Sequence, residues 1–113
     1  MSEPPGEIIV LTTVSDKEQA AAFGRGAVER RLAACVTCLP GAFSYFRWES
    51  EAVGEEAEVL LFLKTDRRKL ADLEQYFKTE HPYKVPEFIV LTPEAVSDAY
   101  GSWMRTELHL ERA

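Results

Sequence analysis

The order of strand-like and helix-like segments is the feature that most limits how this chain can fold. Residues 7–14 (EIIVLTTV) are apolar and β-branched, as in a buried strand, and residues 15–33 place apolar side chains at helical spacing. A long hairpin, a second helix, a fourth strand and a terminal helix follow. The later strands are expected at 34–40 with 43–49, at 57–65 and at 87–93, and the later helices between Asp66 and Pro82 and at 97–108. This βαββαβ order predicts an α+β fold, the ferredoxin-like sandwich, in which two helices pack on one face of an antiparallel sheet and an extra helix ends the chain.

Local signals indicate where the helices begin and how the strands bend. Ser15 followed by Glu18 predicts a capping box, and Asp66 is placed to cap the second helix. Gly24 lies on the apolar stripe of the first helix, which predicts a close approach of that helix to the sheet. Pro40-Gly41 interrupts the second strand and predicts a bend or a bulge there.

Length and charge limit the function classes. The 113 residues form one domain, which we place at 7–113 after a flexible N-terminus at 1–6. A formal net charge of −6 disfavours nucleic acid and anionic membranes as partners. The first residues lack a signal-peptide pattern, and no apolar run reaches the roughly 20 residues that span a bilayer. We therefore expect a cytoplasmic protein that binds neither nucleic acid nor membrane.

One face of the predicted sheet has no helix to cover it. Residues 57–65 (AEVLLFLKT) are apolar on both sides of the strand, so the uncovered side needs another apolar surface. In a chain of this length a second copy of the same chain is the simplest cover. The sequence therefore predicts a homo-oligomer.

Aromatic side chains concentrate in residues 43–48 (FSYFRW), where strand alternation places Phe43 and Tyr45 on one face and Phe46 and Trp48 on the other. RNA-recognition sheets share the element order, but residues 57–65 lack their K/R-G-F/Y-G/A-F-V-x-F/Y stretch. Packing in the core or between subunits is the favoured role of these aromatic residues. The residues that we assign to packing or to an interface are Phe43, Tyr45, Phe46 and Trp103. In the terminal helix, Ala99, Trp103 and Leu108 are expected to face inward.

Both cysteines lie in one short stretch, at Cys35 and Cys38. In a strand, residues an odd number apart point to opposite faces, so the two thiols cannot share a metal ion. Their Cα atoms would be about 10 Å apart, beyond the ~7 Å limit for a disulfide. We expect two free thiols that act as small, buried apolar side chains.

The loop at residues 81–87 (HPYKVPE) gathers unusual side chains between the second helix and the fourth strand. A neutral imidazole at His81 and a carboxylate at Glu87 are the beginning of a transition-metal site. The alternative is that His81 interacts with the carbonyls at the end of its helix and that Glu87 only begins a strand. Residue types alone leave both interpretations open.

The sequence carries no recognised catalytic motif. It contains no G-x-S-x-G elbow, no glycine-rich phosphate loop and no HExxH pattern. His109, near the C-terminus, is interpreted as a surface residue. A binding or regulatory protein is therefore favoured over an enzyme.

Several segments together resemble the CutA divalent-cation tolerance proteins in order and spacing, over nearly the whole chain. The segments are ERRLAACVTCLPG (29–41), SYFRWES (44–50), EEAEVLLFLKT (55–65), HPYKVPEFIVL (81–91) and YGSW (100–103). The resemblance implies a ferredoxin-like subunit in a tight cytoplasmic homotrimer, similar to the PII signalling proteins. It also implies a role in tolerance of copper and other divalent cations, with no organic cofactor and no enzymatic activity.

The resemblance also suggests where a ligand could sit. It implies copper or another divalent cation at His81 and Glu87, beside a cleft between subunits with Tyr83, Lys64 and Trp48. An alternative is a structural or signalling trimer of PII-like type that binds a small ligand or a protein partner without direct metal binding.

The chain departs from the family pattern at four positions. Thr12 stands where some members have a copper-binding cysteine, and a hydroxyl is a much poorer ligand for Cu(I) than a thiolate. Phe46 replaces a tyrosine, Ser50 a glycine and Gly101 a leucine. The exact metal triad of those members is therefore absent from this sequence.

Overall fold

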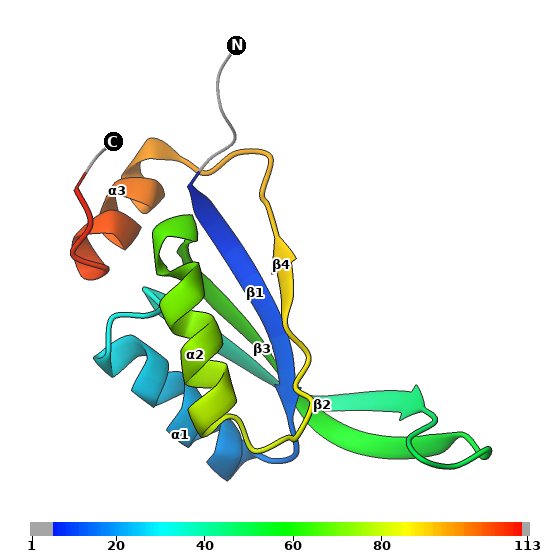
Figure 1. The fold of residues 1–113 in the computed structure, drawn as a ribbon. Helices are drawn as coiled ribbons and strands as arrows, with labels where there is room; N and C mark the ends of the chain where they lie inside the picture. Colours follow the sequence, from blue (N-terminus) through cyan, green and yellow to red (C-terminus); the bar gives the residue numbers. More distant parts are fainter. Residues whose placement is uncertain (1–5, 112–113) are drawn as a thin grey trace.

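The structure, a computed structural model, describes residues 6–111 and confirms the predicted order of elements. Residues 1–5 of the segment predicted to be flexible lie outside the described residues. The elements are β1 (Glu7–Val14), α1 (Lys17–Glu29), β2 (Cys35–Phe46), β3 (Gly54–Asp66), a 3-10 turn (Arg67–Lys69), α2 (Leu70–Glu80), β4 (Ile89–Leu91) and α3 (Asp98–Glu107). The sheet order is β2-β3-β1-β4 with every neighbouring pair antiparallel, and α1 and α2 cover one face (Figure 1). This is the ferredoxin-like arrangement.

The capping box of α1 is one residue later than predicted. Asp16, not Ser15, is the N-cap, and its Oδ1 accepts a hydrogen bond from the Gln19 backbone N–H at 2.8 Å. The Gln19 side chain in turn accepts the Ser15 backbone N–H at 2.9 Å. The sequence SDKEQ offers two pairs at capping-box spacing, Ser15 with Glu18 and Asp16 with Gln19. The second pair forms and satisfies free backbone N–H groups at the start of α1. Asp66 caps the 3-10 turn Arg67–Lys69 and not α2 itself, which begins after Lys69 without a side-chain cap.

The core lies between the helices and one face of β1 and β3. Val10, Leu61 and Leu63 are fully buried on that face, and Phe23 packs against the rings of Tyr76 and Phe77. Strand alternation explains the pattern, because every second residue of β1 from Ile8 to Val14 is buried. The central strands are thus fixed by the apolar face that α1 and α2 cover.

Two glycines in α1 have separate packing reasons. A Cβ at Gly24 would lie 3.2 Å from Val36 Cγ1, which confirms the predicted close approach of helix and sheet. A Cβ at Gly26 would overlap the Tyr76 hydroxyl, which donates a hydrogen bond of 2.8 Å to the Phe23 carbonyl. Gly26 therefore gives room to a buried hydrogen bond between α1 and α2.

Strands β2 and β3 continue past the helices as a projecting hairpin, the β2–β3 arm (residues 42–58; Figure 1). The predicted bulge is confirmed, because the strand register shifts between Leu39 and Ala42, and Gly41 has φ of 91°. Strand β2 is at the edge of the sheet. An edge strand tolerates Pro40, which has no backbone N–H to donate to a neighbouring strand.

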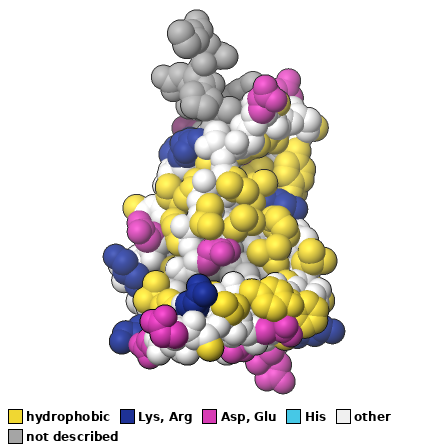
Figure 2. Space-filling view, turned by 90° about the vertical axis from the view of Figure 1, so that its right-hand side faces the viewer, with side chains coloured by type: hydrophobic (Ala, Val, Ile, Leu, Met, Phe, Trp, Pro, Cys, Tyr) yellow, Lys and Arg dark blue, Asp and Glu magenta, His cyan; other side chains and the backbone are white. Residues whose placement is uncertain are grey.

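The second face of the sheet, the open face, carries no helix. It presents Ile9 and Leu11 of β1, Leu39 of β2, Phe62 of β3, and Ile89 and Leu91 of β4, which the strand register places on one side. Leu39 is 55% exposed, Ile89 47% and Leu91 43%. Figure 2 shows hydrophobic side chains gathered across this face. The predicted uncovered apolar surface is present.

The orientation predicted for the terminal helix is wrong for Ala99 and Trp103 and confirmed for Leu108. Ala99 is exposed and Trp103 is 42% exposed, whereas Gly101, Met104 and Leu108 face inward. The reason is that Gly101 lies directly against the Glu7 side chain, and any larger residue there would overlap it. A close helix approach at Gly101 rotates the alanine and the tryptophan toward solvent. No helix among residues 6–111 is long and apolar enough to cross a membrane.

Candidate functional site

His81 begins the loop at residues 81–87 and is held by strand β1. Its Nε2 lies 3.1 Å from the Thr13 carbonyl oxygen and 3.0 Å from Thr12 Oγ1. Its Nδ1 accepts the Tyr83 backbone N–H at 3.0 Å. A carbonyl can only accept and an N–H can only donate, so the proton is on Nε2 and the ring is neutral. Burial lowers the pKa of His81 below its usual value, although the Thr13 carbonyl and Glu58 oppose that shift.

Both interpretations of His81 from the sequence can be compared with this geometry. Its backbone N–H bonds the Phe77 carbonyl at the end of α2, but its ring nitrogens are used by β1 and by the loop. The ring also packs against Phe23 and Phe77, with centroid distances of 5.1 and 5.5 Å. The imidazole therefore joins α2, β1 and the loop as a neutral group, and it does not act as a cation on the helix carbonyls.

Tyr83 extends the same network to the sheet. Its hydroxyl donates to Glu58 Oε2 at 2.7 Å and lies 3.1 Å from Ser15 Oγ. Burial and the bond to Glu58 raise the pKa of Tyr83 to about 12. Glu58 is 8% exposed, so this hydrogen bond compensates for much of the cost of a nearly buried carboxylate.

Glu87 lies at the other end of the loop and is more exposed than His81. Its pKa is raised, first by partial burial and then by the negative charge of Glu58. A carboxylate with a raised pKa beside a second carboxylate favours a proton or a cation in its vicinity.

A complete metal site is not formed within one chain. Among residues 6–111 no group of three His, Cys, Asp or Glu side chains is arranged to hold a metal ion. Both ring nitrogens of His81 are already hydrogen-bonded, and Thr12 contributes a hydroxyl to that network in place of a thiolate. The residues of a single chain therefore do not fit a copper ion.

The structure separates the other residues that were assigned to a ligand cleft. Lys64 pairs with Ile9 and projects on the open face, whereas His81 contacts Thr12 on the helix-covered side of β1. Trp48 follows β2 at the base of the hairpin loop and is 56% exposed. Only Tyr83 lies in direct contact with His81.

The cysteines lie on opposite faces of β2, as predicted, and both are free thiols. The prediction that they are buried is wrong, because β2 is at the edge of the sheet, where Cys35 is partly exposed and Cys38 is exposed. Cys35 lies 3.9 Å from Lys64 Nζ on the open face. Cys38 lies on the helix side, where its Sγ would be 3.8 Å from a Cβ at Gly24.

The four aromatic residues assigned to packing are all on the surface of a single chain. Phe43 and Tyr45 on the β2–β3 arm are 63% and 66% exposed. Phe46 is less exposed and lies on the other side of the arm, and Trp103 lies beside Tyr100 on α3 with a centroid distance of 5.5 Å. None of them belongs to the core of the subunit.

Sequence reasoning missed Glu58 and Ser15 as parts of the loop network. Glu58 is the only acidic residue in the apolar stretch at 57–65, and this was the available signal. Ser15 was assigned to helix capping, so its contact with Tyr83 was not anticipated.

The comparisons with known proteins agree with this fold. The family model described as CutA1 divalent ion tolerance protein matches residues 8–107. The chain is 40% identical to the divalent-cation tolerance protein CutA of Thermus thermophilus over 99 residues, which cover 88% of this chain and 95% of that protein. It is 34% identical to the protein of the same name from Pectobacterium atrosepticum over 110 residues, 96% of this chain and 99% of that protein. The solved structure of CutA from Synechococcus elongatus superposes with a TM-score of 0.87 at 39% identity, covering 94% of each chain. The chain belongs to the CutA1 divalent ion tolerance family.

Proposed function

We propose that the protein acts in divalent-cation tolerance as a cytoplasmic homotrimer, and that it is a metal-binding or regulatory protein and not an enzyme. Family membership supports the tolerance role. The observation that carries the assembly is the open face, where Leu39, Ile89 and Leu91 would remain in water in a lone chain. An apolar surface of this kind, continuous over four strands, is typical of a subunit interface.

The β2–β3 arm supports the same assembly. Phe43 and Tyr45 project from a hairpin that extends beyond the helices, so few groups of the same chain can cover them. Exposed aromatic residues on a rigid element are common anchors of protein interfaces. In the proposed trimer each arm packs against a neighbouring subunit.

Copper or another divalent cation is the proposed ligand, with Glu87 and His81 as its residues from one subunit. Since one chain supplies an incomplete set, further ligands would come from a neighbouring subunit. The carboxylates of Glu87 and Glu58 support this position, because a cation there would relieve their mutual repulsion. The proposed cleft has Tyr83 at its centre. Because Lys64 and Trp48 lie away from His81 within one chain, they would line this cleft from a neighbouring subunit.

A second candidate function is favoured by one specific observation. Both ring nitrogens of His81 are engaged inside the chain, so the loop network could serve only to lock the fold. The trimer would then be a PII-like signalling or structural assembly that binds a small ligand or a protein partner without direct metal binding.

Native mass spectrometry separates these candidates. The purified protein is measured alone, with Cu(II), with Zn(II), and with Cu(I) under reducing conditions, beside Glu87→Gln and the control Glu74→Gln on the exposed side of α2. The metal proposal predicts a trimer with three equivalent ions that are lost in Glu87→Gln and kept in the control. A trimer that stays free of metal under all conditions contradicts metal binding and leaves the PII-like alternative.

A further inference from the structure

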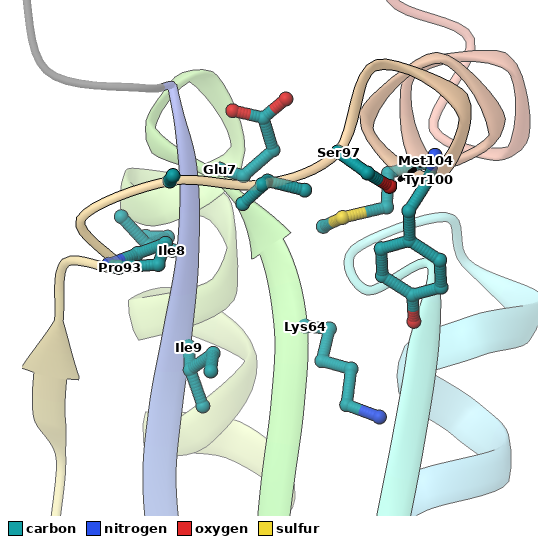
Figure 3. A pocket seen from close by; sticks show the side chains of 10 residues that line it. Glu7, Ile8, Ile9, Lys64, Pro93, Ser97, Tyr100 and Met104 are labelled. Atoms are coloured by element: carbon teal, nitrogen blue, oxygen red, sulfur yellow. Dashed lines mark hydrogen bonds between the residues drawn. The ribbon is translucent and has the colours of Figure 1, made fainter.

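Helix α3 is attached to the rest of the subunit by little apolar contact. Met104 of α3 and Leu108 after it form a small buried cluster with Ala34 and Leu110, and this cluster is separate from the main core. A hollow of about 340 Å³ lies between α3 and the strands β1 and β3, where Met104 and Tyr100 line it (Figure 3). Because an unfilled space provides no dispersion contacts, apolar packing holds α3 more weakly than it holds α1 and α2.

An ion pair attaches α3 to the start of β1. Arg105 Nη1 donates to Glu7 Oε1 at 3.0 Å, and the two side chains are 20% and 11% exposed. Gly101 provides the room for the Glu7 carboxylate, since a Cβ there would overlap it. A largely buried charge that loses its partner is strongly destabilising, so this pair favours the attached position of α3.

Two further arginines hold the C-terminal end of α3 and the segment that follows it. Arg31, which follows α1, donates from Nη1 to the Glu107 carbonyl at 2.7 Å and lies 3.5 Å from the Glu107 carboxylate. Arg68, which precedes α2, donates from Nη1 to the Glu111 carbonyl at 2.8 Å. Cations are favourable at the end of a helix because its last carbonyls carry partial negative charge. The two arginine side chains are 43% and 42% exposed, so dissolved salt weakens these contacts.

The backbone at Arg31 is strained, and its side chain compensates for the strain. Its φ of 58° lies in the left-handed region, at the position after α1 that glycine commonly occupies. A glycine there would not carry this strain. The hydrogen bond to Glu107 offsets the strain only while α3 is attached. Arg31 therefore links the end of α1 to the attachment of α3.

We propose that residues 98–110, the α3 strap, open as a unit before the sheet unfolds, and that ionic strength controls the opening through the three arginines. The apolar contact of the strap is small, whereas its polar contacts are sensitive to salt. Opening uncovers Glu7 and Ala34 at the end of the sheet and removes Tyr100 and Met104 from the rim of the open face. These contacts lie within one chain, so the strap requires neither the trimer nor the cation proposed for the 81–87 loop.

Amide hydrogen exchange of the full protein, at one protein concentration, measures this opening. A detached helix of ten residues is marginal in water, so opening frees the backbone N–H groups of α3 for exchange. At low salt, and relative to their intrinsic rates, we expect the amides of α3 to exchange at least about 10-fold faster than the hydrogen-bonded amides of β1 and β3. At about 0.5 M NaCl the α3 amides should exchange about 3-fold faster than at low salt, and the strand amides should not change.

Variants of the arginines separate the contacts. Arg105→Met leaves Glu7 without its partner and should speed the exchange of α3 at least about 10-fold. Adding Glu7→Gln should restore part of the protection, because no unpaired charge then remains. Arg31→Gly should speed α3 exchange about 3-fold but leave strand exchange unchanged, because glycine relieves the strain at this position while the contact with α3 is lost. The control Arg25→Met, on the exposed side of α1, should exchange like the unmodified protein.

Light scattering of the same samples gives the mass of the assembly, and circular dichroism establishes that each variant is folded. Equal protection of α3 and of the strands at both salt concentrations would overturn the proposal, and so would unchanged α3 exchange in folded Arg31→Gly and Arg105→Met. Exchange of α3 that rises only together with a loss of assembly mass would also contradict it, because a neighbouring subunit, and not the arginines, would then hold the helix.

Discussion

Replacing His81 with alanine should destabilise the fold even when no metal is present. The change removes the hydrogen bonds of Nε2 to Thr13 and of Nδ1 to the Tyr83 backbone, worth about 1 kcal/mol each. It also removes a ring that is 8% exposed and packs against Phe23 and Phe77. Large-to-alanine changes at full burial cost about 3–5 kcal/mol. Because the site lies at the edge of the core, where water can re-solvate the freed groups, we expect a total loss near 3 kcal/mol.

The same variant should lose a pH dependence. The pKa of His81 is lowered in the folded chain, so the unfolded chain binds more protons between that pKa and the usual value near 6.5. Stability contributed by the neutral ring is therefore present above about pH 6.5 and falls as the pH drops toward the folded pKa. The slope is at most about 1.4 kcal/mol per pH unit for one group.

Urea unfolding in EDTA, at matched protein concentration and at several pH values, measures both effects. Matched concentration is needed because assembly contributes to apparent stability. A loss below about 1 kcal/mol, or an unchanged acid slope in His81→Ala, would refute the argument that this imidazole is a structural, neutral group.

Three further changes test other parts of the structure. Gly26→Ala should destabilise the fold by about 1–3 kcal/mol, because its methyl group displaces the Tyr76 hydroxyl. In a Tyr76→Phe background the same change should stabilise the fold by up to about 1 kcal/mol, because alanine has the higher helix propensity. Equal shifts of the melting temperature in both backgrounds would contradict this packing. Tyr83→Phe leaves Glu58 without its hydrogen-bond donor and should lower the free energy of unfolding in urea by about 1–2 kcal/mol. Because the pKa of Tyr83 is raised to about 12, the intact protein should lose stability as the pH rises from about 10 to about 12, and Tyr83→Phe should not show this loss. Phe43→Ser should weaken the assembly in dilution experiments and leave the circular dichroism of the subunit unchanged, so unaltered dissociation would exclude the β2–β3 arm from the interface.

Much of the fold could be predicted because apolar periodicity alone decides it. The apolar segments at residues 7–14 and 57–65 identify the central strands, and the Pro40-Gly41 interruption locates the bulge. Both segments are apolar on the two sides of the strand, so they do not indicate which side the helices cover. The start of α1 was missed by one residue because Ser15 and Asp16 are both good caps and only the contact with Gln19 decides between them.

The terminal helix shows why spacing can mislead. Trp103 is the larger apolar residue, so it was expected to face inward, but the space above Glu7 admits only Gly101. Helix orientation here depends on a contact between residues nearly a hundred positions apart, which no local pattern reports.

The candidate site was predictable in position and not in chemistry. The loop at 81–87 was found because a histidine, a tyrosine and a glutamate cluster there with two prolines. The protonation of His81 follows from partners in β1, and the partner of Tyr83 lies on β3. Such long-range contacts are fixed by the tertiary fold and leave no spacing signal in the chain.

The most direct test of the central claim is the mass of the assembly, measured by light scattering during gel filtration without added metal. The proposal that the open face is a subunit interface predicts about 38 kDa for the unmodified protein, three times the 12.8 kDa of the chain. Leu91→Glu, which places a charge on the open face, should give a folded species near 12.8 kDa, and Lys78→Glu on the helix side should leave the larger mass unchanged. A monomeric mass for the unmodified protein, or a trimer that persists in Leu91→Glu, would contradict the account.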